Sequence, residues 1–70
     1  MPNEYALPHR RLIQAAHAYL INTDALSSKD RCDVVAFALH AGVSIGIAAH
    51  CLKVEIPDRA ANTLAVLGCW

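Results

Sequence analysis

The feature that most constrains this chain is a run of nineteen residues without a charge, residues 34–52, in a sequence of 70 residues. Apart from two histidines, one serine and one cysteine, the run consists of aliphatic residues, glycine and a single phenylalanine. An uncharged segment of this length can cross a membrane, supply a pair of short helices, or form the packed seam of a small helical domain. The residues within the run and beside it distinguish these alternatives.

The small size of the chain limits how much it can stabilise itself by burial. A chain of this length buries only about 60% of the surface that its unfolded form exposes, so a lone copy is of marginal stability. Its residues are 56% hydrophobic but only 6% aromatic, which leaves apolar surface that a small core does not cover. We therefore expect the chain to associate with a second copy or with another protein.

The charges and the cysteines indicate a cytoplasmic protein with little attraction to polyanions. Six basic and six acidic residues give a formal net charge of zero, so nucleic acid is attracted only weakly at long range. Cys32, Cys51 and Cys69 are an odd number without the close spacing of a disulfide framework, which favours free thiols in a reducing compartment. Residues 1–11 lack the basic segment and apolar stretch that a signal peptide requires.

Hydrophobic periodicity predicts an all-α fold, a small bundle of three to four short helices that forms a single domain over residues 1–70. Pro8 suits the first turn of the first helix. The predicted buried stripe of that helix contains Leu12, Ile13, Ala16, Tyr19 and Leu20. Ser27, which stands three positions before Asp30, predicts a capped second helix that begins near Ser28.

The end of the chain predicts one more helix after a short connection. Residues 52–56 alternate apolar and charged side chains, which predicts a short extended piece. Pro57 fits the first position of a last helix over residues 58–68. Gly68 is suited to end that helix in the left-handed conformation.

As a membrane helix, residues 34–52 are close to the roughly 20 residues that a bilayer requires. The two histidines and the central glycine weaken this single-span alternative, and the balanced charges on both sides of the run give little orientation signal. A buried helical segment of a domain that does not cross the membrane accounts for the same pattern. We therefore expect no membrane association.

The same run resembles the helix-turn-helix family of DNA-binding regulators over about fifteen residues. Ala38, Gly42, Val43 and Ser44 match the alanine, the turn glycine and the following Val-Ser of that family, and Leu52 falls near a core position. The resemblance implies a transcriptional regulator whose second helix enters the major groove. That helix needs polar or basic side chains on its exposed face, whereas residues 45–50 are apolar except for one histidine. Nucleic-acid binding is therefore the alternative, not the main expectation.

As a packed seam, the run offers small residues at a spacing of four. Ala38, Gly42 and Gly46 would form a small-xxx-small row on one face if the helix continued through Gly42. If the chain turns there, Gly42 instead ends one helix and Ser44 caps the next. We favour the turn, and in both cases we expect the segment to lie in a core or an interface.

The histidines and cysteines do not predict a metal site. His9 and His17 are eight residues apart, as are Cys32 and His40, and eight residues of helix separate two side chains by about 12 Å. A tertiary cluster of Cys32, His40 and His50 is the alternative. Satisfied buried histidines and inert thiols account for the same residues, so we expect neither a metal nor another cofactor.

No pattern in the sequence predicts catalysis. His50 stands beside Cys51, but no carboxylate is near enough in sequence to orient the histidine. The chain has neither a phosphate-binding glycine loop nor paired carboxylates on one helical face, and a chain of this size has little room for a substrate pocket. We therefore expect a protein without enzymatic activity.

These exclusions leave a non-enzymatic protein-binding module that acts through an apolar helical surface. We expect a homodimer or a small stoichiometric regulator or inhibitor of a larger protein assembly, a class that includes inhibitors encoded by phages and other mobile elements. Arginine and the amphipathic aromatic residues are enriched at interfaces, which points to Tyr5 as a further anchor. The predicted interface residues are Arg10, Arg11, Tyr19, Ala38, Gly42, Gly46 and Trp70.

Overall fold

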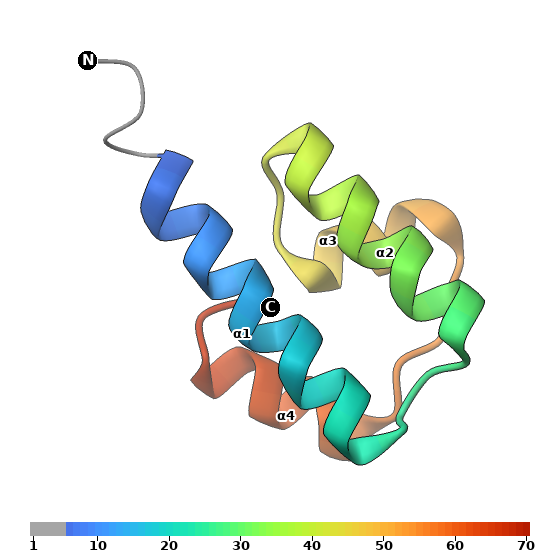
Figure 1. Cartoon of the computed structure of the whole chain (residues 1–70). Helices are drawn as coiled ribbons and strands as arrows, with labels where there is room; N and C mark the ends of the chain where they lie inside the picture. Colours follow the sequence, from blue (N-terminus) through green and yellow to red (C-terminus); the bar gives the residue numbers. More distant parts are fainter. Residues whose placement is uncertain (1–5) are drawn as a thin grey trace.

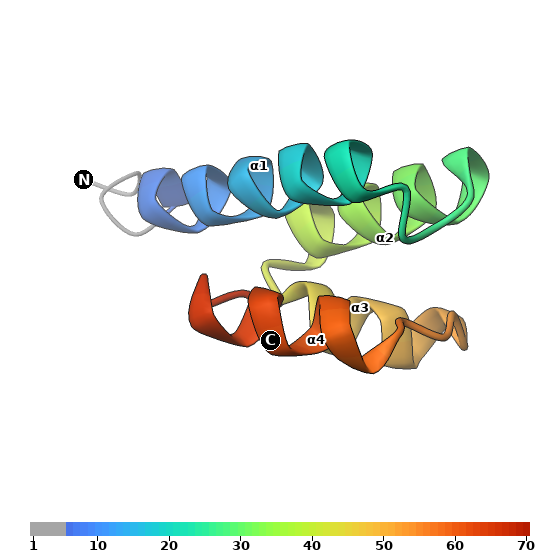
Figure 2. The ribbon, with the colours of Figure 1, turned by 90° about the horizontal axis from the view of Figure 1, so that it is seen from below.

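The structure is a computed structural model that describes residues 6–70. It contains four helices and, within those residues, no strand: α1 (Ala6–Thr23), α2 (Ser28–Ala41), α3 (Ile45–Leu52) and α4 (Asp58–Val66). Figure 1 shows the order of the helices, and Figure 2 shows two layers, α1 with α2 above α3 with α4. The prediction of a small all-α bundle is confirmed.

Helix α1 buries most of its predicted stripe. Ile13, Ala16 and Leu20 are buried and Tyr19 is half-buried, as the three-and-four spacing predicts. The prediction for Leu12 is wrong, because this side chain is 40% exposed. Its Cδ2 atom lies 3.8 Å from the β-carbon position of Gly68, in the chain after α4.

The start of α2 follows the predicted cap. Ser27 is the N-cap residue, and its hydroxyl accepts a hydrogen bond of 3.1 Å from the backbone N–H of Asp30. The helix begins at Ser28 and buries Val34, Val35 and Ala38. Its far end is joined to α1, since the Nε2 atom of His9 lies 3.1 Å from the carbonyl oxygen of Ala38.

The uncharged run turns at Gly42, as we favoured. Gly42 is in the left-handed conformation, with φ of 71°, and its N–H donates to the carbonyl oxygen of Ala38. A β-carbon there would meet nothing within 4 Å, so the backbone conformation, not lack of space, favours glycine. Ser44 then caps α3 by accepting a hydrogen bond of 3.2 Å from Ile47 N–H. The continuous row through Ala38, Gly42 and Gly46 is therefore absent.

The connection between α3 and α4 differs from the predicted extended piece. Leu52 still belongs to α3, and Lys53 ends that helix in the left-handed conformation with φ of 58°. The left-handed conformation of Lys53 turns the chain, so the segment does not continue as an extended piece. The alternation of apolar and charged side chains therefore does not indicate a strand here. Pro57 is the N-cap of α4, one residue before the predicted position. Gly68, with φ of 84°, adopts the predicted left-handed conformation.

The core lies between the two layers. Helix α2 packs against α1 and α3, and α3 packs against α4. No polar or charged residue is classed as buried among the residues that the structure describes. The buried residues are Ile13, Ala16, Leu20, Leu26, Val34, Val35, Ala38, Ile45, Ala48, Ala49, Ala60, Leu64 and Cys69.

Candidate interaction surface

The residues after α4 form a short strap, residues 68–70, that crosses from α4 to α1 and α3. Gly68 directs the chain away from α4 by its positive φ of 84°. The backbone N–H of Cys69 donates to Leu64 at 2.8 Å, and its thiol donates to the carbonyl oxygen of Leu12 at 3.1 Å. Cys69 is 1% exposed, and this burial raises the pKa of its thiol. The buried thiol thus attaches the strap to α1.

The strap also satisfies polar groups at the start of α3. The N–H of Gly46 donates to the carbonyl oxygen of Cys69 at 3.2 Å, and the hydroxyl of Ser44 donates to the backbone oxygen of Trp70 at 3.0 Å. The Trp70 ring lies against Gly46, where an added β-carbon would be only 2.8 Å from Cδ2. Backbone groups that a helix N-terminus leaves unpaired are therefore partnered here by the strap.

Large apolar side chains remain exposed around the strap. Leu12 is 40%, Ile47 51% and Trp70 50% exposed. Leu12 and Ile47 both adjoin the strap or a residue that it contacts: Cδ2 of Leu12 is 3.8 Å from the β-carbon position of Gly68, and Ile47 follows Gly46, which Trp70 covers. We call Leu12, Ile47 and Trp70 the strap surface. A tryptophan with half of its area in water is typical of a contact site between proteins.

The outward face of α3 has almost no polar groups. Ile47, His50 and Cys51 are exposed, whereas Ile45, Ala48 and Ala49 are buried. Leu52, at the end of α3, is also exposed. The segment that the helix-turn-helix resemblance identifies as a recognition helix thus presents one imidazole, one thiol and two aliphatic side chains. The turn of three residues before it, residues 42–44, changes the helix direction by 114°.

The structure brings together two of the predicted interface residues, Gly46 and Trp70. Arg10 and Arg11 are exposed on α1, and Tyr19 is half-buried against the core. The other two predicted residues, Ala38 and Gly42, lie in the core and in the turn. Tyr5 lies outside the described residues.

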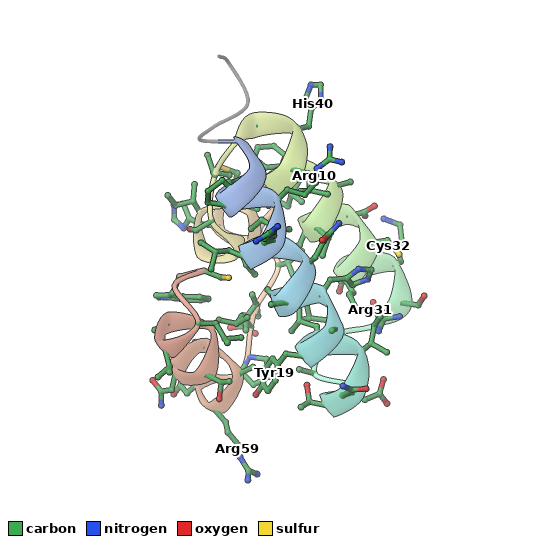
Figure 3. The ribbon with its side chains drawn as sticks, turned by 60° about the vertical axis from the view of Figure 1, so that its left-hand side comes forward. Arg10, Tyr19, Arg31, Cys32, His40 and Arg59 are labelled. Carbon is green, nitrogen blue, oxygen red and sulfur yellow. The ribbon has the colours of Figure 1, made fainter. Side chains whose placement is uncertain are left out.

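Basic side chains occur on several helices of the bundle. Figure 3 shows Arg10, Arg31 and Arg59 on three different helices, with Arg59 extending away from the bundle. His40 extends outward at the opposite end of the same view. The formal net charge of the chain is zero, and these three arginines lie on different helices (Figure 3).

Sequence reasoning missed three residues that build the surface. The sequence places Leu12 in the buried stripe, Ile47 in the apolar run and Cys69 among the free thiols, and it marks none of them as part of this surface or strap. The signal that could have found Ile47 is its spacing from His50 and Cys51, which puts all three on one face of α3. No local signal identifies the contact of Cys69 with α1, because its partner is 57 residues away.

The histidines and cysteines do not form a metal site in the part of the chain that the structure describes. No group of three or more His, Cys, Asp or Glu side chains is placed to hold an ion among residues 6–70. The alternative cluster of Cys32, His40 and His50 is therefore not formed. Cys32 and Cys51 are exposed free thiols, and Cys69 is a buried one.

An open depression of about 350 Å³ lies between α3 and α4 and is lined by Glu55, Ile56, Pro57 and Asp58. Its lining contains two carboxylates and no histidine, cysteine, serine or lysine.

The uncharged run does not form one long helix. Among residues 6–70, no single helix has both the length and the apolar composition needed to span a bilayer, and the pair α2 and α3 meets these two criteria only when both helices are counted across their bend of 114°. Comparisons of the chain with protein-family models, with curated proteins and with solved structures found no match.

Proposed function

We propose that this chain is a non-enzymatic protein-binding module, which acts as a homodimer or as a small stoichiometric regulator or inhibitor of a larger protein assembly. The observation that carries the proposal is the strap surface, where Leu12, Ile47 and Trp70 are exposed on the strap and on the two helices that it contacts. Each exposed apolar side chain costs free energy in water, which association recovers at about 25 cal/mol per Å² of apolar surface buried. Tryptophan at the centre of such a patch is a frequent binding hot spot.

The chemistry around the strap supports a protein partner. Residues 41–52 and 60–70 contain no charged side chain, so a partner can cover them without removing an ion from water. The centre of a protein interface is depleted of charge in the same way. The strap is fixed by hydrogen bonds to Leu12, Gly46 and Ser44, which presents Trp70 in an ordered position and reduces the entropy lost on binding.

DNA binding by a helix-turn-helix is the second candidate. It is favoured by the three-residue turn and the 114° change of direction between α2 and α3, since the family joins its two helices at about 90–120°. Two observations oppose it. The exposed face of α3 offers only His50 as a polar side chain that could reach a base edge. Gly46, in the first turn of α3, which such proteins direct at DNA, is covered by Trp70.

Affinity capture of the tagged chain from its native cell, followed by mass spectrometry, tests the proposal. We expect either a stoichiometric second protein or a second, untagged copy of the chain. The capture is repeated after a high-salt wash, which removes polyanion-mediated contacts but not apolar ones. Recovery of the chain alone and as a monomer, or only together with nucleic acid, would contradict a protein-binding function.

A further inference from the structure

We draw no further inference here: the strongest candidate, the exposed apolar strap surface on α1, α3 and the chain after α4, belongs to the site already described, and nothing in the structure shows what covers it.

Discussion

Gly46 and Trp70 are in a contact that only glycine permits. A β-carbon on Gly46 would lie 2.7 Å from the backbone oxygen of Trp70, 2.8 Å from Cδ2 and 2.9 Å from Cε3 of the ring. The nearest of these atoms belongs to the backbone, so a rotation of the side chain cannot relieve the overlap. The absence of a side chain at one position of α3 therefore determines where the strap lies.

This contact predicts the sign of a substitution that is usually stabilising. Glycine to alanine inside an exposed helix commonly gains about 0.5–1 kcal/mol. Here we expect Gly46→Ala to lower the free energy of unfolding, and Gly46→Leu to lower it by about 1–3 kcal/mol through overpacking. Denaturant unfolding followed by circular dichroism measures both. Gly42→Ala is the control: it strains a left-handed residue in open space but should leave the Trp70 emission unchanged. A stabilised Gly46→Ala chain would show that α3 faces solvent here.

The two serine caps make a second, matched comparison. Ser27 accepts one hydrogen bond, from Asp30 N–H, whereas Ser44 accepts one from Ile47 N–H and also donates one to Trp70. Loss of a cap costs about 1 kcal/mol, so we expect Ser27→Ala to lose about that amount and Ser44→Ala to lose more. Only Ser44→Ala should shift the Trp70 emission to longer wavelength. Equal losses with no change in emission would mean that the strap is not held by Ser44.

The local signals in the sequence predicted much of the fold. Ser27, Gly42 and Ser44 act through hydrogen bonds or backbone angles within a few residues of themselves, and such signals are visible without a structure. The predicted position of Pro57 differs by one residue from the observed N-cap. Proline is compatible with both the N-cap and the first position of a helix, so this signal does not decide between them.

The candidate site could be predicted only in part, because it depends on contacts between distant residues. The sequence predicts that Gly46 packs closely against a neighbouring helix, whereas the structure places Trp70, in the strap after α4, against it. Hydrophobic periodicity gives the face of a helix that is buried and not the element that covers it. For the same reason Leu12 was expected in the core, although it stands at an edge that the strap leaves partly open.

The buried thiol predicts a dependence of stability on pH. Burial raises the pKa of Cys69, so the folded chain favours the neutral thiol over the thiolate. Its contribution to stability is complete below the ordinary cysteine pKa and is lost as the pH rises through the raised value. We expect the melting temperature to fall between about pH 8 and 10, and Cys69→Ser to reduce that fall. An unchanged alkaline profile in the serine variant would assign the loss to other groups.

The exposed and buried thiols should also differ in reactivity. Cys32 and Cys51 are exposed, so in the native chain a thiol reagent should modify two cysteines fast and Cys69 slowly. The Ser44→Ala substitution weakens the attachment of the strap and should therefore raise the rate at which Cys69 is modified. Cys69 reacts only while the strap is open. Three fast thiols in the native chain would contradict a closed strap.

Duplex DNA should not be retained. The chain has a formal charge of zero, and the exposed face of α3 provides one imidazole for contact with bases. At about 0.1–0.15 M salt we therefore expect no shifted band at micromolar protein, since few counterions are released. A shifted band that weakens steeply with salt would favour the helix-turn-helix alternative.

A comparison of two equally exposed isoleucines tests most directly whether the strap surface is the binding site. Ile47, in the strap surface, is 51% exposed, and Ile21, on α1, is 50% exposed. Each is replaced by aspartate, and circular dichroism verifies that both variants stay helical. Affinity capture then measures retention of the partner or of a second copy. We predict that Ile47→Asp lowers retention at least about tenfold, the loss expected for a residue that contributes about 1.4 kcal/mol, while Ile21→Asp retains as much as the native chain. Equal retention by the two variants, or a loss confined to Ile21→Asp, would contradict the claim that the strap surface is the binding site.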